Sequence, residues 1–135
     1  YEILSGLVGS EMCIRDRAIR ALKECGITSY KDPEMQGAWV DGHKVCSIGL
    51  SFLHWVSRHG MSINIDTPDN RVEGIECCGI PAGKHTSLSK LGYDIDVDGG
   101  TIDVNRIERC LIETCEEVLD RTPMEPVEWF PEMIV

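Results

Sequence analysis

The sequence predicts an α+β fold in which helices flank one side of a mainly antiparallel sheet. Three observations lead to this prediction. A helical pattern ends at Gly26, short alternating strand patterns separated by turn residues follow from residue 36, and a second amphipathic pattern starts after Asp103. With 135 residues, the chain has room for one compact domain with a single core.

The helical patterns carry recognisable end signals. The first, over residues 17–25, repeats apolar residues at helical spacing before its Gly26 stop. A short helix over residues 86–91 is predicted to end at Gly92. Asp103 is predicted to cap a longer helix. The expected buried stripe of that helix consists of Ile107, Leu111, Cys115 and either Val118 or Leu119.

The strand patterns begin with a hairpin. Residues 38–40 and 43–45 flank Asp41-Gly42, a pair that suits a type I′ turn. In the strand that follows, Lys44 has the same parity as a predicted apolar face made of Cys46, Ile48, Leu50 and Phe52. The next strand alternates between one side made of His59, Met61, Ile63 and Ile65 and another made of Arg58, Gly60, Ser62 and Asn64. A short strand over residues 72–75 is expected to lead into a Cys-Gly turn.

Composition and charge argue against several classes of function. The net charge of −10 disfavours binding to nucleic acid or to an anionic membrane surface, since both need a basic face. The apolar runs are too short and too interrupted to span a bilayer. Seven cysteines at irregular spacing do not suggest an even disulfide framework. The sequence therefore favours a reducing compartment, a bacterial cytoplasm or a mitochondrial matrix, in which most thiols pack as small hydrophobes.

Cys78 and Lys44 are the candidate catalytic residues. Gly79 allows the backbone a positive φ, so that a turn can present the side chain before it. A cysteine thiolate can carry an acyl group as a thioester, and a nearby lysine ammonium raises the thiolate fraction at neutral pH. The same amine, once desolvated, can act as the base of a second transfer. Taken singly, a buried structural cysteine and a surface lysine whose stem covers the strand are the alternatives.

Other residues with reactive side chains have weaker support. His59 is expected either to donate a hydrogen bond near the site or to be structural. Cys77, beside Cys78, invites a vicinal disulfide or a metal site with His85, but adjacent side chains in extended backbone point to opposite faces. The spacing of the histidines and cysteines supports no zinc site, so no metal is expected.

Four short segments follow one another in an order that indicates a family. They are Gly-x-Trp-Val…Lys-Val-x-x-Ile-Gly over residues 37–49, His-Gly-x-x-x-Asn over 59–64, Cys-Gly-Ile over 78–80 and Thr-Ser-Leu over 86–88. Together they resemble the octanoyltransferase family of lipoate biosynthesis, within the lipoate and biotin protein ligase superfamily. The resemblance covers residues 18 to about 119, and it implies a biotin/lipoate protein ligase-like fold.

The resemblance implies a ping-pong acyl transfer that needs no metal, no ATP and no other cofactor. Cys78 would take octanoyl from octanoyl-acyl carrier protein as a thioester, helped by Lys44. A lysine of a lipoyl domain, in a 2-oxoacid dehydrogenase or the glycine cleavage H protein, would then accept the group as an amide. The family positions that bind the substrate correspond here to Ser47, Ile48, Gly49, His59, Gly60, Met61 and Ser62.

The same resemblance suggests boundaries for the domain. Residues 1–17 resemble a translated sequencing adaptor and are expected to be non-native, with an ordinary N-terminal strand and turn as the alternative. Residues 18–121 are expected to form a partial catalytic domain, truncated at its N-terminus because the family's upstream Arg-Gly-Gly and His-Gly-Pro-Gly-Gln motifs have no counterpart. Residues 122–135, with three prolines, are expected to form an extended tail.

Three other functions are compatible with these residues. One is a non-catalytic or inactive member of the fold that binds acyl groups or lipoyl domains. A second is an ATP-dependent lipoate-protein ligase, although no Gly-rich phosphate loop supports it. The third is a metal or redox module built on Cys77, Cys78 and His85. The sequence also departs from the family at Glu76-Cys77, where a proline is usual before the nucleophile, and at Cys46, where a small apolar residue is usual.

Overall fold

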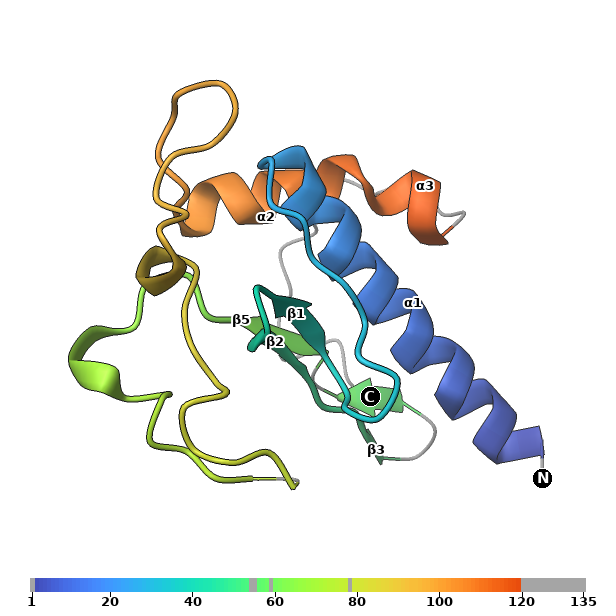
Figure 1. Ribbon diagram of the computed structural model, residues 1–135. Coiled ribbons are helices and arrows are strands. Elements are labelled where there is room, and N and C mark those ends of the chain that lie inside the picture. The colour runs from blue at the N-terminus through green and yellow to red at the C-terminus, as the bar shows by residue number, and fades with distance from the viewer. Residues whose placement is uncertain (1, 54–55, 59, 78, 120–135) are drawn as a thin grey trace, which may run out of the picture.

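A three-stranded antiparallel sheet and one long helix organise the fold, seen here in a computed structural model (Figure 1). The structure describes residues 2–53, 56–58, 60–77 and 79–119. The sheet has the order β1 (Ala38–Val40), β2 (His43–Ile48), β5 (Met61–Ile63). β3 (Ser51–Leu53) and β4 (Val56–Arg58) form a separate antiparallel pair.

The helices gather on one side of the three-stranded sheet. Figure 1 shows α1 (Glu2–Glu24) running along the sheet and crossing α2 (Val104–Glu113), which continues into the short helix α3 (Cys115–Leu119). The Arg17 guanidinium on α1 donates from Nε and Nη2 to the carbonyl oxygen of Leu111, at 3.0 and 2.9 Å, and so joins α1 to α2. The predicted α+β fold with a mainly antiparallel sheet is confirmed.

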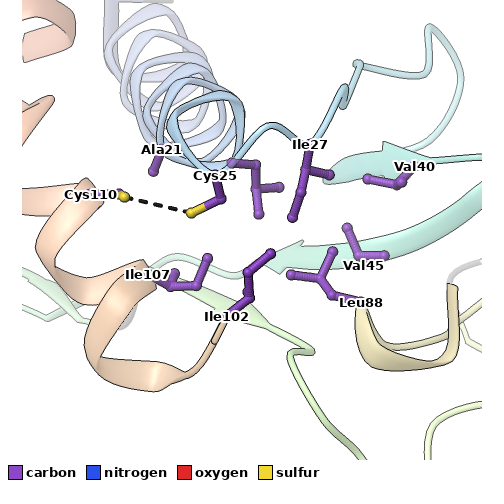
Figure 2. Close-up of a cluster of buried hydrophobic side chains, with 10 residues drawn as sticks. Ala21, Cys25, Ile27, Val40, Val45, Leu88, Ile102, Ile107 and Cys110 are labelled. Atoms are coloured by element: carbon purple, nitrogen blue, oxygen red, sulfur yellow. Dashed lines mark hydrogen bonds between the residues drawn. The ribbon is translucent and has the colours of Figure 1, made fainter. Parts of the chain in front are cut away.

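The main core lies between α1, α2 and the sheet (Figure 2). Ala21 and Leu22 on α1 and Cys25 just after its end recur at helical spacing, and each is at most 2% exposed. The other buried members of the main cluster are Ile27, Val40, Val45, Leu88, Ile102, Ile107 and Cys110. These side chains come from both helices, from two strands and from the loops, so the whole domain shares this core.

Two cysteines meet inside this core. The Sγ atoms of Cys25, directly after α1, and Cys110 on α2 lie 3.6 Å apart, as the dashed line in Figure 2 marks. Burial, together with the neighbouring thiol, raises the pKa of Cys25 to about 12. The Cys25 thiol therefore stays protonated at neutral pH, and both side chains pack as small hydrophobes, as predicted for most thiols of this chain.

A β-bulge in β2 makes the predicted parity of Lys44 wrong. Ala38 pairs with Cys46, but Trp39 pairs with Lys44, so Val45 is an extra residue in β2. Val45 and Cys46 are both fully buried, the first in the main core and the second against an alanine of α1. Because side chains alternate along a strand, Lys44 points to the face away from α1, opposite to Cys46.

The hairpin and the helix cap match the prediction. Asp41 and Gly42 have φ angles of 49° and 78°, as a type I′ turn requires. The Asp103 carboxylate accepts a hydrogen bond from the Arg106 backbone N–H at 2.8 Å and caps α2. The expected stripe is interrupted, because α2 ends at Glu113 and a new helix begins at Cys115. Leu111 and Cys115 are only half-buried.

Several predicted boundaries in the second half of the sheet region are wrong. The strand after the hairpin breaks at Gly49, where the Gly49 N–H donates to the carbonyl of Gly60 at 3.1 Å. The following strand is also split, into β4 and β5. Residues 71–74 form turns, because local backbone hydrogen bonds there replace a partner strand. One single-turn helix, η1 (Pro68–Asn70), precedes them.

The predicted helix over residues 86–91 shrinks to η2 (Ser89–Leu91), which does end at Gly92 as expected. The reason is that the N–H groups of Thr86 and Leu88 already bond the carbonyls of Lys44 and Asn64. At the other end of the chain, α1 begins at Glu2, so the described residues 2–17 are helical and the strand-and-turn alternative is wrong. The predicted tail, residues 122–135, lies outside the described residues.

Within the described ranges, no helix is both long enough and apolar enough to cross a membrane.

Candidate active site

Lys44 is enclosed on the face of β2 that points away from α1. Only 6% of the residue is exposed. Its backbone N–H donates to the carbonyl of Lys84 at 2.7 Å, and its own carbonyl accepts from the Thr86 N–H at 3.2 Å, so residues 84–86 run beside β2. Gly37 lies against the side chain, since a Cβ there would be 2.8 Å from Lys44 Cε. Most of the Lys44 side chain is therefore covered by neighbouring segments, unlike that of an exposed surface lysine.

His85 links Lys44 to the Cys-Gly turn. The histidine is 5% exposed and pairs with Lys44 in an isolated parallel bridge. Burial lowers the pKa of His85, and the positive charge of Lys44 lowers it further, so the imidazole is neutral at pH 7. Its Nε2 lies 3.7 Å from the Sγ of Cys77. The fold thus gathers an enclosed cation, a neutral imidazole and a thiol in one place.

The Cys-Gly turn is anchored at its tip and at its base. At the tip, the Ile80 N–H donates to the carbonyl of Cys77 at 2.9 Å, and Gly79 has a φ of 76°, a positive value of the kind that glycine allows. At the base, a carboxylate oxygen of Glu73 accepts a hydrogen bond from Thr86 Oγ1 at 3.0 Å. The loop is thereby tied to the segment that runs beside Lys44.

Two of the predicted site residues, Cys78 and His59, lie outside the described residues. Their positions in the sequence place them next to described groups of the site: Cys78 follows Cys77, and His59 precedes Gly60. Their roles stay predictions.

Six of the seven predicted substrate-binding residues surround one hollow of about 520 Å³, a volume typical of small-molecule sites. Its lining consists of Ser47, Ile48, Gly49, Leu50, Ser51, Gly60, Met61 and Ser62. The β2–β5 ladder brings the two halves together, since Ser47 pairs with Ser62 and Ile48 with Met61. Cys46 and Ile48 pack toward α1, so alternation puts Ser47 on the same face as Lys44. Binding of substrate by these residues stays a prediction.

Cys46, a further thiol near the site, is a poor candidate for chemistry. Burial raises the pKa of Cys46 to about 11, although the nearby Lys44 charge and a backbone hydrogen bond oppose the effect. Cys46 therefore remains a thiol at neutral pH. Among the residues that the structure describes, no three His, Cys, Asp or Glu side chains are grouped so that they could hold a metal ion.

Comparison with known proteins gives the site its context. Residues 14–115 match the family described as the lipoyl protein ligase A/B catalytic domain. The chain belongs to this family. The octanoyltransferase of Rubrobacter xylanophilus is 33% identical over 108 residues, which are 78% of this chain and 46% of that protein. The octanoyltransferase of Zymomonas mobilis is 39% identical over 92 residues, 63% of this chain and 43% of that protein.

A third relative, the octanoyltransferase of Caldanaerobacter subterraneus subsp. tengcongensis, is 32% identical over 85 residues, 63% of this chain and 37% of that protein. The lipoyl protein ligase A/B domain of this chain thus spans less than half the length of each of these three relatives. The resemblance to the octanoyltransferase family, inferred from the order of four short motifs, is confirmed.

Sequence reasoning missed one feature of this lipoyl protein ligase A/B domain, the contact between Cys77 and His85. The sequence suggests these two residues only as metal ligands or redox groups. A signal was available: Gly79, Pro81 and Gly83 lie between them, and such a cluster of turn residues predicts that the chain doubles back. Two side chains on either side of such a turn are natural neighbours.

Proposed function

We propose that this domain carries the acyl-transfer chemistry of an octanoyltransferase, an acyltransferase that acts in protein lipoylation. The observation that carries the proposal is the enclosure of Lys44 beside His85 and the Cys-Gly turn. A lysine is rarely buried without a functional or ionic partner. Here its neighbours are an imidazole and the loop that contains the predicted nucleophile, within a family whose curated relatives are named octanoyltransferases.

In the first step, the Cys78 thiolate attacks the carbonyl carbon of an octanoyl thioester on acyl carrier protein. The carbon–sulfur bond of the donor breaks, and the carrier's thiolate takes a proton from the Lys44 ammonium. Cys78 then holds octanoyl as a thioester. The role of Lys44 before this step is to favour the thiolate electrostatically, because a cation near a thiol stabilises its ionised form.

In the second step, the amine of a lysine on a lipoyl domain attacks the Cys78 thioester. Lys44, now neutral, takes the proton that the attacking amine loses, and Cys78 leaves as a thiolate. The product is an amide on the lipoyl domain of a 2-oxoacid dehydrogenase or of the glycine cleavage H protein. The hollow lined by residues 47–51 and 60–62 would hold the acyl chain, with Ile48 and Met61 as apolar contacts. The thiol chemistry requires a reducing compartment, a bacterial cytoplasm or a mitochondrial matrix.

The test follows the octanoyl group by mass spectrometry. The chain is incubated with octanoyl-acyl carrier protein without ATP, and a lipoyl domain is then added. We expect one octanoyl group on Cys78 that hydroxylamine removes, followed by octanoylation of the lipoyl-domain lysine. Cys78→Ser should abolish this transfer, and Cys13→Ser, at an exposed thiol on α1, should leave it unchanged.

Each other outcome contradicts the proposal in a distinct way. Unchanged octanoyl transfer by the Cys78→Ser variant would contradict a mechanism through a thioester on Cys78. A requirement for ATP would identify a lipoate-protein ligase instead. Binding of the lipoyl domain without any transfer would indicate a non-catalytic member of the fold.

A further inference from the structure

Cys77 and His85 form a contact that the proposed mechanism does not use. Cys77 is an exposed residue, whereas His85 is 95% buried, and the His85 Nε2 lies 3.7 Å from the Cys77 sulfur. A thiol at this distance from an imidazole nitrogen has the arrangement of a nucleophile and its base. The two residues come from opposite ends of the loop, and the tip and base of that loop are both hydrogen-bonded. The contact is therefore built into the fold.

We propose that Cys77 and His85 form a second nucleophile–base pair, in which Cys77 accepts an acyl group from small thioesters. The choice of thioesters as substrate class rests on the proposed function, whereas the pair itself rests on the geometry. A hollow of about 620 Å³ adjoins the thiol and leaves space for the incoming group. Its lining consists of Glu76, Cys77, Gly79, Ile80 and Pro81.

The reaction balances within this pair. In the tautomer that carries its proton on Nδ1, His85 accepts the Cys77 proton at Nε2. The thiolate attacks the thioester carbonyl carbon, and the bond between that carbon and the donor sulfur breaks. The donor's thiolate then takes the proton back from Nε2 of the imidazolium and leaves as a thiol. No oxidant, metal or nucleotide enters the balance.

The surroundings of His85 suit both halves of this exchange. Burial and the Lys44 charge keep the imidazole neutral, so it is ready to accept a proton. The same two effects penalise the imidazolium once it has formed, so it readily returns the proton to the leaving thiolate. Glu76 precedes Cys77 in the sequence. It is exposed and contributes an acidic side chain to the lining of the hollow.

Cys13 provides an internal reference for this chemistry. Like Cys77 it is an exposed, free thiol, but it lies on α1, and among the described residues no histidine ring forms a hydrogen bond with it. We would treat the chain at pH 7 with S-octanoyl-N-acetylcysteamine, a small thioester, and follow each thiol by peptide mapping. Fragmentation between residues 77 and 78 separates the two neighbouring thiols. A general base contributes about 10²–10⁴-fold, so we expect Cys77 to react at least roughly 10²-fold faster than Cys13.

Variants test the base directly. His85→Ala should slow acylation of Cys77 to about the rate of Cys13, and added imidazole should restore part of the rate by filling the space left by the ring. His43→Ala is the matched control, because the His43 ring contacts the carbonyl of Asp41 rather than a thiol. Equal rates for Cys77 and Cys13 in the unsubstituted chain would overturn the proposal even if His85→Ala failed to fold. An unchanged rate in a folded His85→Ala variant would overturn it too.

Failure of this inference is distinguishable from failure of the proposed function. In Cys78→Ser, the pair should still place an acyl group on Cys77, and Cys77→Ser in the same background should abolish it. Acylation of Cys78 alone, followed by transfer to a lipoyl domain, would overturn the second pair and support the proposed function. Acylation of Cys77 without any transfer to a lipoyl domain would support the second pair and overturn the proposed function.

Discussion

At the scale of single residues, the environment of Lys44 explains why a lysine occupies a strand with buried neighbours. The bulge at Val45 turns Lys44 away from the apolar side, toward the segment that carries His85. Gly37 makes room for the lysine stem, because any side chain there would collide with Lys44 Cε. The cation is thus positioned by backbone geometry and by the absence of a Cβ, as well as by its own side chain.

Removal of this cation should lower the reactivity of Cys78. We expect Lys44→Met, which keeps an apolar stem of similar length, to slow alkylation of Cys78 by iodoacetamide at pH 7 roughly tenfold, because less thiolate is present. Lys84→Met is the matched control, since Lys84 is exposed and lies on the segment beside β2. Equal rates in the two variants would show that Lys44 does not act on Cys78.

Gly37 provides a second prediction at this scale. Its φ is 108°, and a Cβ would lie 2.1 Å from the carbonyl oxygen of Cys46. Gly42 also has a positive φ, but a Cβ there would meet nothing within 4 Å. We expect Gly37→Ala to lower the free energy of unfolding by more than about 1 kcal/mol and by more than Gly42→Ala does, because only the first adds a clash to the strained φ. Urea denaturation measures both; a smaller effect for Gly37→Ala would contradict the close approach.

At the scale of elements, local signals were reliable where one short segment decides its own conformation. Asp41-Gly42 adopts its turn and Asp103 caps its helix, since each needs only neighbouring backbone groups. The helix predicted from Thr86 does not form at its start, because the N–H groups of Thr86 and Leu88 bond to carbonyls of residues that are distant in sequence. The parity of Lys44 failed because a bulge in one strand is set by its pairing with another.

The candidate site follows the same division. The motif order led to Lys44 and to the residues of the first hollow, and the fold does bring six of them around it. The Cys77–His85 contact depends on how a loop returns to β2, and this return is fixed by a hydrogen bond between Thr86 and Glu73, which lie 13 residues apart in the sequence. Sequence patterns thus located the segments of the site, and tertiary hydrogen bonds decided which side chains meet.

The cap of α2 gives a prediction for one element. Asp103→Ala should lower the free energy of unfolding by about 1 kcal/mol, because the Arg106 N–H loses its acceptor. Asp103→Ser should recover most of that loss, since serine is also a good cap. Glu108→Ala removes an exposed carboxylate from the same helix and serves as the control. Equal stability of the alanine and serine variants, measured by urea denaturation, would show that the cap contributes little.

At the scale of the whole molecule, Arg106 ties three parts of the fold together. It lies on α2, its Nε donates to the carboxylate of Asp96 in the preceding loop, and its Nη2 donates to the carbonyl of Glu24, at the end of α1, at 3.5 Å. The side chain of Asp96 is 2% exposed and that of Arg106 is 14% exposed. In a chain with 23 acidic and 13 basic residues, this enclosed pair joins the two long helices through the loop between the sheet and α2.

This pair should make stability depend on pH at the acidic end. A hydrogen bond from the Asp98 backbone, with the Arg106 guanidinium, holds the pKa of Asp96 below its ordinary value. A carboxyl whose pKa is lower in the folded state stabilises that state above its ordinary pKa, near 4, and this contribution is lost as the pH falls through the lowered value. Asp96→Asn should therefore be less stable than the unsubstituted chain at pH 6, and the difference should shrink as the pH falls below 4. Urea denaturation at pH 6, 4 and 3 measures this difference in stability. Asp66→Asn, at an exposed residue, is the control. A difference between Asp96→Asn and the unsubstituted chain that stayed constant across this range would show that the ionised Asp96 does not hold the helices together.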